Sequence, residues 1–351
     1  MKLFYIFIFS VVSTFIFTQI AIRIGFKFNV LDRPEKRKIH VQPVPLLGGL
    51  ALAIPYLLIL FVIRNEFDIV ILSVLFGGLI ILIVGFLDDL NKLSARLRLG
   101  IQILVVLMLI TNSATLTIFP NTAWGIILRC LITILWIVGI TNAMNFLDGM
   151  DALCAGLVCI SSLCFAVIAF FTNQNQILFL SIILFGCCLG FLPHNLKPAK
   201  VFLGDSGSTF LGFMLASIAV VGVWAQDRIV GISIPILILG VPIFDMVFTT
   251  VMRVKEGKVK NVKQWLEYAG KDHFHHRLVD LGLQPQGAVI FIYLVSICLG
   301  ISAMVLLRAT WKIAIILLIQ AAAIFLMIAV LMIIGKRRRS GWNIDKLKAK
   351  D

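Results

Sequence analysis

Four groups of acidic side chains lie at the ends of long apolar runs, and their residue types suit chemistry on a phosphate. Carboxylates are costly beside hydrocarbon, so residues of this kind are candidates for function. Carboxylates together with histidines and cations suit a reaction of phosphates that a divalent metal ion assists. The groups are Asp88 with Asp89; Asn145, Asp148 and Asp151; Asp205; and Asp272 with His273, His275, His276 and Arg277.

The adjacent pair Asp88 and Asp89 ends the third apolar run. Neighbouring residues of a helix point about 100° apart, so the two carboxylates cannot clamp one ion together. One of them can face a metal ion or a nucleophile while the other faces a cation. We treat both as candidate catalytic residues, with a solvated helix end as the alternative.

Asn145, Asp148 and Asp151 follow one another at intervals of three residues. On a helix this spacing places the three side chains on one face. Three oxygen-bearing groups on one face suit Mg²⁺ or the polar edges of a nucleotide. Asp148 is therefore a candidate metal ligand and, with Asp151, a candidate catalytic residue, while Asn145 is a candidate for substrate binding. A capped loop between two spans is the alternative.

Two glycines and two serines surround Asp205 at the start of the eighth apolar run. Their backbone N–H groups can face a phosphate where a helix begins. Asp205 is a candidate metal ligand, although an aspartate here would also serve as an ordinary helix N-cap. Asn195, upstream of it, is a candidate for substrate binding. Phe202 could stack on a nucleotide base, or it could belong to the core.

Three of the five histidines lie together at His273, His275 and His276, followed by Arg277. Histidine and arginine side chains can donate hydrogen bonds to a pyrophosphate, and this interpretation fits the other groups. Zinc binding is an alternative, but neither cysteine nor an open-site carboxylate pattern accompanies these histidines. Simple exposure at the membrane surface is the remaining alternative.

The composition excludes a soluble globular domain, because 60% of the 351 residues are hydrophobic and 14% are charged. Such a composition is typical of a chain that crosses a membrane several times. The net charge of +14 comes mainly from cations in short loops between the apolar runs. Membrane topology and anionic lipids explain this placement better than nucleic acid does.

Eleven apolar runs have about the length that a bilayer requires, which predicts an all-α multi-pass membrane protein. We expect one membrane domain over residues 1–335 and a basic tail over residues 336–351. The runs cover residues 3–22, 45–63, 69–87, 99–117, 122–141, 153–172, 176–192, 207–224, 230–251, 288–306 and 313–334.

Lysine and arginine are unevenly distributed between the two sets of loops. The richer set should face the cytoplasm, which places the N-terminus outside and the C-terminus inside. The sequence thus predicts a multi-pass protein of the cell (inner) membrane with a single active-site cleft facing the cytoplasm. Every acidic group then lies in cytoplasmic loops, near residues 23–44, 88–98, 142–152, 193–206 and 252–287.

The first of these loops carries Lys38 and His40 shortly before the pair Gly48 and Gly49. A basic segment that leads into a glycine-rich helix start can bind a lipid phosphate. The alternative is that the topology alone requires basic residues here.

These motifs, in this order, resemble those of the polyprenyl-phosphate N-acetylhexosamine-1-phosphate transferase superfamily. The resemblance extends from about Lys27 to Leu283. It implies a helical bundle with a cytosolic cleft, in which a sugar 1-phosphate moves from a UDP-sugar to polyprenyl phosphate and UMP is released. It also implies a requirement for Mg²⁺, with Mn²⁺ as a substitute, and it allows a homodimer.

The same resemblance assigns roles to single residues. Asp88 resembles the aspartate proposed to assist or deprotonate the lipid phosphate, and Asp89 and Lys92 belong to the same motif. Asp205 resembles the principal Mg²⁺ ligand, and Phe202 resembles the residue that stacks on uracil. The remaining matches are with the nucleotide and metal shell (Asn145, Asp148, Asp151) and the pyrophosphate-binding motif (His273, His275, His276, Arg277).

The histidine segment, residues 272–278, resembles that of the N-acetylglucosamine branch of the superfamily. The peptidoglycan branch, which takes UDP-MurNAc-pentapeptide, has three consecutive histidines instead. N-acetylglucosamine 1-phosphate is therefore the expected group, and the pentapeptide donor is the alternative. A transporter or lipid flippase is a third hypothesis, but it would place its charges near the bilayer midplane.

Overall fold

The computed structural model describes residues 1–33, 42–261, 264–265, 268, 270 and 272–348, with side chains as far as residue 335. The candidate lipid-phosphate residues Lys38 and His40 lie outside the described residues. So do several positions between residues 262 and 271.

The chain is a bundle of α-helices with one two-stranded antiparallel sheet, in which Leu31 pairs with Pro45. Short 3₁₀ turns follow α2 (η1, Arg64–Glu66) and α13 (η2, Leu306–Arg308). The elements are α1 Lys2–Lys27, β1 Leu31–Asp32, β2 Val44–Pro45, α2 Gly48–Val62, α3 Ile69–Asn91, α4 Ala95–Thr111, α5 Ala123–Leu147, α6 Leu153–Phe171, α7 Asn175–Asn195, α8 Gly204–Val221, α9 Arg228–Ile238, α10 Gly240–Lys255, α12 Phe274–Asp280, α13 Pro285–Val305 and α14 Trp311–Lys348.

Among the described residues, eight helices are long and apolar enough to cross a membrane, or nine if α9 and α10 count as one span. The predicted all-α multi-span architecture is confirmed, but the count of eleven spans is not. Each predicted run overlaps a helix, yet α2 has 15 residues and α4 has 17. At about 1.5 Å per residue, both are shorter than a hydrocarbon core of about 30 Å.

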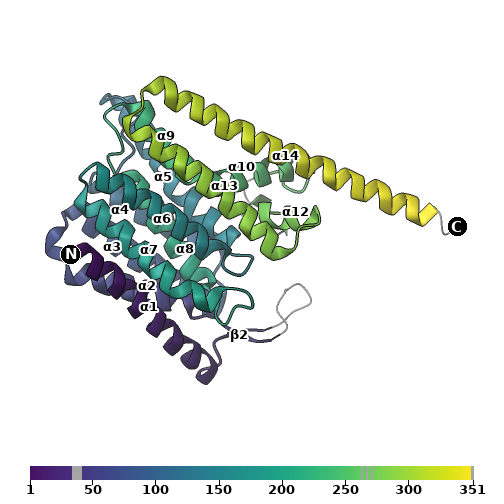
Figure 1. Ribbon diagram of the computed structural model, residues 1–351, viewed down its shortest axis with the longest axis horizontal. Coiled ribbons are helices and arrows are strands. Elements are labelled where there is room, and N and C mark those ends of the chain that lie inside the picture. The colour runs from purple at the N-terminus through teal and green to yellow at the C-terminus, as the bar shows by residue number, and fades with distance from the viewer. Residues whose placement is uncertain (34–41, 262–263, 266–267, 269, 271, 349–351) are drawn as a thin grey trace.

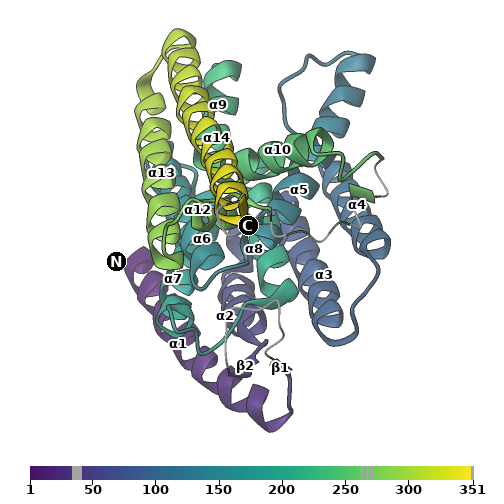
Figure 2. The same ribbon diagram turned by 90° about the vertical axis from the view of Figure 1, so that its right-hand side faces the viewer.

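The ninth predicted run is not one straight helix, because α9 and α10 meet at an angle of 77° around Leu239. Pro242 explains the break, since proline has no N–H to donate and its ring collides with the carbonyl four residues earlier. That carbonyl belongs to Ile238, the last residue of α9. Figure 2 shows α10 lying across the direction of its neighbours.

Helix α8 forms the centre of the bundle and is almost entirely buried. It packs against α3 and α5 along its length and also contacts α2, while α1 and α6 flank α7. Close approach depends on glycine: a methyl group added at Gly49 would collide with the backbone of Gly207, and one at Gly212 with Thr141. Glycine lets backbones approach in this way in membrane helices.

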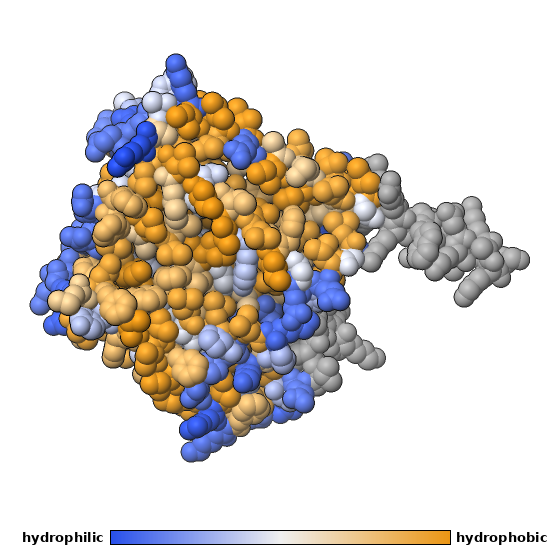
Figure 3. Space-filling view, viewed as in Figure 1, coloured by the Kyte–Doolittle hydropathy of each residue, from blue (hydrophilic) through white to orange (hydrophobic). Residues whose placement is uncertain are grey.

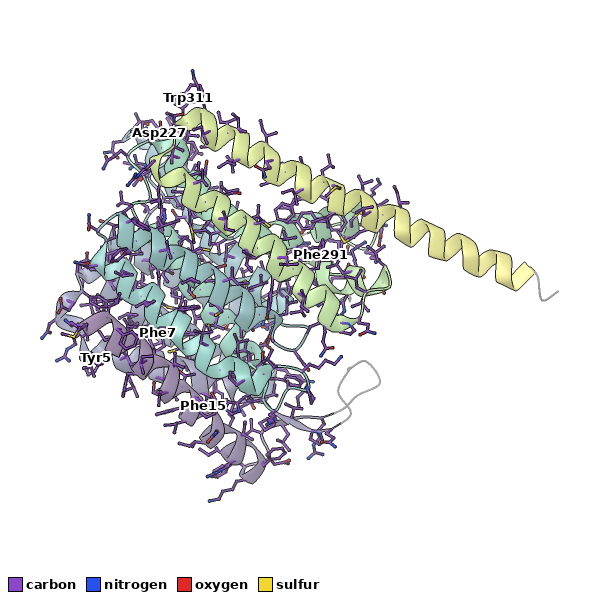
Figure 4. All side chains as sticks on the ribbon, viewed as in Figure 1. Tyr5, Phe7, Phe15, Asp227, Phe291 and Trp311 are labelled. Carbon is purple, nitrogen blue, oxygen red and sulfur yellow. The ribbon has the colours of Figure 1, made fainter. Side chains whose placement is uncertain are left out.

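The surface is divided as a membrane-embedded protein requires. Apolar side chains cover a broad band between polar groups at the left edge and at the lower right (Figure 3). Phe7, Phe15 and Phe291 lie along this band, and Asp227 and Trp311 mark one end of it (Figure 4). The β-strands, α12 and the last turns of α14 lie at the opposite end from the N-terminus and the start of α9 (Figure 1).

The Gly49–Gly207 contact predicts that an added methyl group destabilises the protein at Gly49 but not at Gly139. Gly49→Ala should lower the thermal midpoint of the detergent-solubilised protein, because overpacking costs about 1–3 kcal/mol. Gly139→Ala is the matched control, since nothing lies within 4 Å of a methyl group there. A Gly49→Ala protein as stable as the Gly139→Ala protein would contradict the backbone contact.

Candidate active site

A cavity of about 1470 Å³ opens at the end of the bundle that carries the β-strands and α12. It gathers the end of α1, the two strands, the turn from α5 to α6, the segment before α8, and the start of α13. Five carboxylates line it, together with Asn145, Asn195, Lys197, Lys200, Phe202 and His276. The carboxylates are Asp32, Asp89, Asp148, Asp151 and Asp205.

Asp89 caps helix α8 from the end of helix α3. Its two carboxylate oxygens accept hydrogen bonds from the backbone N–H groups of Asp205 at 2.7 Å and Ser206 at 3.0 Å. The side chain of α8's own N-cap residue, Leu203, makes no such bond. The first N–H groups of a helix have no partner inside the helix, and a negative charge there is favourable. Asp89 therefore sets the position of Asp205.

The Asp205 carboxylate is also held by the side-chain amide of Asn145, which donates to a serine hydroxyl as well. Asn145 donates from Nδ2 to the Asp205 carboxylate at 2.6 Å and to the Ser208 hydroxyl at 2.9 Å. A nitrogen of Arg98 lies 3.6 Å from the second oxygen of Asp205. This carboxylate remains on the cavity wall.

Asp88 faces away from the main cavity and is only 4% exposed. Its carboxylate accepts a hydrogen bond from Arg98 and another from the backbone N–H of Leu93 at 2.6 Å. The two adjacent aspartates thus diverge as the helix geometry predicts. Asp89 lies on the cavity, and Asp88 lies against a cation.

Asp148 is the C-cap residue of helix α5 and lies near the other carboxylates of the cavity. Burial raises its pKa well above the usual value, and the negative charges of Asp205, Asp89 and Asp151 raise it further. A carboxyl group in this position favours either a proton or a cation beside it. The site therefore concentrates more negative charge than its own side chains neutralise.

Asn195 and Asp151 hold the neighbouring loops together. Asn195 accepts from the backbone N–H of Ala152 at 3.0 Å and donates to the carbonyl of Val201 at 2.8 Å. Asp151 accepts from the backbone N–H of Ala199 at 3.2 Å. Both residues lie on the cavity wall, and both shape it through the backbone.

The histidine segment is divided between the cavity and the interior. Of the four predicted side chains, His276 lines the cavity, whereas His273, His275 and Arg277 are buried behind it. Arg277 donates from Nε to the carbonyl of Asp272 at 2.6 Å and lies over the ring of Phe248. Burial, and after it the charge of His276, lowers the pKa of His275 to about 3. His275 is therefore neutral at physiological pH.

Of two other predicted residues, Phe202 lies on the cavity wall and Lys92 does not. Phe202 lies on the cavity wall, and its backbone bonds to Pro45 and Gly48 through contacts of 2.9 and 3.0 Å. Lys92 is exposed, and its left-handed backbone conformation ends α3. It does not belong to the described residues that line the cavity.

Four residues of the site were missed by the sequence analysis. Arg98 pairs with Asp88, and Tyr293 of α13 lines the cavity and donates to the carbonyl of Ala152. Asp245 and Arg253 of α10 are buried beside the histidine segment. Asp245 stands inside an apolar run, which is itself a signal of function or of a buried partner.

No group of three histidine, cysteine, aspartate or glutamate side chains among the described residues is arranged to hold a metal ion alone. Magnesium does not require such a group, because it keeps several waters and is usually bound by one or two carboxylates together with phosphate oxygens. Asp148 and Asp205 offer oxygen ligands of this type on one wall of the cavity.

Comparison with known proteins identifies the family. Residues 71–223 match the model of glycosyl transferase family 4. A protein of Bacillus subtilis, "Probable undecaprenyl-phosphate N-acetylglucosaminyl 1-phosphate transferase", is 36% identical over 312 residues, which cover 87% of this chain and 85% of that protein. The chain belongs to glycosyl transferase family 4. The family predicted from the motifs is thus confirmed.

Two further relatives are also similar to this chain. "Decaprenyl-phosphate N-acetylglucosaminephosphotransferase" of Mycolicibacterium smegmatis is 33% identical over 77% of this chain and 74% of its own length. "Phospho-N-acetylmuramoyl-pentapeptide-transferase" of Prochlorococcus marinus is 30% identical over 61% of this chain and 67% of its own length. The family match includes Asp88 and Asp205, whereas the histidine segment lies beyond it.

The Asp88–Arg98 pair predicts that loss of the arginine destabilises the fold. Arg98→Met leaves a buried carboxylate without its cation, which should cost about 1–3 kcal/mol. The thermal midpoint should therefore fall, and Arg98→Lys should restore part of it. Arg228→Met, at an exposed position at the start of α9, is the control and should change little. Equal midpoints for Arg98→Met and Arg228→Met would show that the pair contributes nothing.

Proposed function

We propose that this protein transfers N-acetylglucosamine 1-phosphate from UDP-N-acetylglucosamine to polyprenyl phosphate and releases UMP. The observation that carries the proposal is the cavity on which Asp89, Asn145, Asp148 and Asp205 converge from three helices. The printed names of the relatives from Bacillus subtilis and Mycolicibacterium smegmatis support this donor group and this type of acceptor. The product would begin the membrane stage of a cell-envelope polysaccharide.

The polar wall of the cavity suits the nucleotide sugar. Phe202 offers a ring for the uracil base, and Asn145 and Asp151 offer hydrogen-bonding groups in the same cavity. Lys197 and Lys200 add positive charge to the cavity lining. His276, which also lines the cavity, can donate to the pyrophosphate.

Part of the cavity lining is apolar and suits the lipid acceptor. Ile22 and Phe26 of α1 and Val289 and Ile290 of α13 belong to this part. Both helices carry exposed apolar side chains on the rest of their surface, as helices in contact with lipid do. A membrane substrate can thus reach the carboxylates without leaving an apolar environment.

The donor chemistry of the site fits Mg²⁺, and we propose Asp205 and Asp148 as its protein ligands. The raised pKa of Asp148 has the surrounding negative charges among its causes, and a divalent cation would remove that cost. Bound there with the pyrophosphate, Mg²⁺ would neutralise charge on the transferred phosphoryl group.

In the proposed reaction, an oxygen of the lipid phosphate attacks the β-phosphorus of the UDP-sugar. The bond from that phosphorus to the bridging oxygen breaks, and UMP leaves with the electron pair. Asp88 and Asp89 are engaged by Arg98 and by two backbone N–H groups, so neither is placed as an unhindered nucleophile. A lipid phosphate is largely ionised near pH 7, and positioning with charge neutralisation then suffices for the attack.

We also propose that the cavity faces the cytoplasm, with the N-terminus outside and the basic tail inside. The distribution of lysine and arginine supports this orientation. A UDP-sugar is too charged and polar to cross the membrane unaided, so the cavity must face the side on which it is made. One membrane domain over residues 1–335, a homodimer, and lipid-phosphate contacts by Lys38 and His40 remain predictions.

The purified protein should release UMP from UDP-N-acetylglucosamine in the presence of undecaprenyl phosphate and Mg²⁺. UDP-N-acetylgalactosamine and UDP-MurNAc-pentapeptide, assayed side by side, should react more slowly. Removal of the lipid phosphate, or of the metal by a chelator, should abolish release. Preference for the pentapeptide donor would move the protein to the peptidoglycan branch, and no release from folded protein with any donor would refute the proposal.

Asp205→Asn tests the assignment of the metal ligand in the same assay. The substitution keeps the shape of the side chain and removes its charge, so turnover should fall on the order of 100-fold or more. The thermal midpoint should change little, because the Asp89 cap uses the backbone of residue 205. Full activity of this variant would exclude Asp205 as a ligand.

A reporter fused after Asp351 should signal from the cytoplasm. The prediction follows from the basic tail, since the positively charged ends of spans stay on that side. A reporter fused before Met1 should signal from the opposite side. Signals in the reverse order would invert every loop and remove the cavity from its nucleotide substrate.

A further inference from the structure

A chain of buried polar contacts joins α10 to the histidine segment. Asp245 is fully buried, and its carboxylate accepts from the backbone N–H of Phe274 at 2.6 Å and contacts Nδ1 of His273 at 2.8 Å. The other ring nitrogen of His273 lies 3.1 Å from Arg253. Arg253, which is 1% exposed, forms two-pronged contacts with Asp272 at 2.7 and 3.0 Å.

These contacts determine the proton position on His273. A guanidinium group can only donate, so Nε2 of His273 must accept from Arg253. The ring proton then lies on Nδ1 and is donated to Asp245. In this arrangement His273 is neutral, both its nitrogens are occupied, and it has no donor left for a substrate.

Each buried charge in the chain of contacts has hydrogen-bonded partners, which explains how it is tolerated in the interior. Burial alone would raise the pKa of Asp272, but the hydrogen bonds and charge of Arg253 hold that pKa below its usual value. Buried charges are tolerated when they are paired and fully hydrogen-bonded. The network therefore acts as a rigid unit between α10 and α12.

Through this network, α12 packs against the segment that carries Asn145 and Asp148 of the cavity. The ring of His273 stacks on Phe146 at 4.8 Å between centroids, and Phe146 lies between Asn145 and Asp148 in the chain. His275 packs on Gly149, where an added methyl group would collide with its ring. The ring of His276 lies 4.2 Å from the ring of His275, and its side chain reaches the cavity wall.

We infer that Asp245 and Arg253 are positioning residues, which fix His273 so that His276 alone of the three histidines is presented to the substrate. Neither residue lines the cavity, and both act through α12. Their effect on turnover rests on the proposed function, whereas the proton position on His273 does not.

A double-mutant cycle tests the inference on turnover. Asp245→Asn leaves one acceptor oxygen where the carboxylate has two, so the side chain can no longer accept from both His273 and the backbone of Phe274. We expect kcat/KM for UDP-N-acetylglucosamine to fall on the order of 100-fold, because small misplacements of a substrate-binding group have such effects. In a His276→Asn background, the same substitution should cost less than about threefold, since the two act through one contact.

Equal losses in both backgrounds would show that Asp245 merely stabilises the fold, and would overturn the inference. Asp227→Asn is the matched control, because Asp227 caps α9 at the far end and asparagine is an equally good cap. It should retain full activity. If Asp245→Asn failed to fold, the second measurement would decide.

The second measurement is ¹⁵N NMR of histidine-labelled wild-type protein at pH 7. The chain has five histidines, so single histidine-to-asparagine variants assign each signal. We expect the His273 ring to be neutral with its proton on Nδ1. A proton on Nε2, or on both nitrogens, would overturn the inference. The expected signal in a protein that releases no UMP would refute the proposed function and leave this arrangement intact.

Discussion

The position of the candidate active site depends on one carboxylate at the end of one helix and the free N–H groups at the start of another. Asp89 belongs to α3, and the N–H groups belong to residues 205 and 206 of α8. At the end of α3 the charge opposes the helix dipole, and at the start of α8 it is favourable. The contact therefore favours the position of α8 in which Asp205 accepts a hydrogen bond from Asn145.

The interior of the protein uses polar contacts in two different ways. Around α8 they lie at the wall of a cavity, and Asp89 there accepts from two backbone N–H groups. Between α10 and α12 they join buried side chains to one another and to the backbone of residue 274. Helix α10 shows why the second kind is possible here, because Asp245, Thr249 and Arg253 recur every four residues on its inner face. Exposed valines cover its outer face, as lipid contact requires.

Much of this arrangement could be predicted from the sequence. Each apolar run overlaps a helix, and Asp89, Asp148 and Asp205 converge, because helix ends on one side of a membrane are brought together by the bundle. The divergence of Asp88 from Asp89 also follows from helix geometry. Which of the two would face the cavity did not follow, since that depends on where α8 lies, and α8 is more than a hundred residues away in the chain.

The histidine segment illustrates a second limit of sequence analysis. Spacing shows that His273, His275 and His276 are close together, but it does not show which nitrogen already has a partner. The partners are Asp245 and Arg253, which lie in and just after a run that hydropathy marks as a span. The bend between α9 and α10 brings them to the segment, and Pro242 was the visible sign of that bend.

The glycine contacts beneath the cavity have a consequence for inhibitors of this enzyme family. Gly48 lies against the carbonyl of Phe202, and Gly49 lies against the backbone of Gly207. The backbone of Phe202, which lies on the cavity wall, is thus held by main chain packed on main chain. A drug that binds against this backbone would not be displaced by a simple change at either glycine, because an added side chain there would also shift the segment that lines the proposed substrate site.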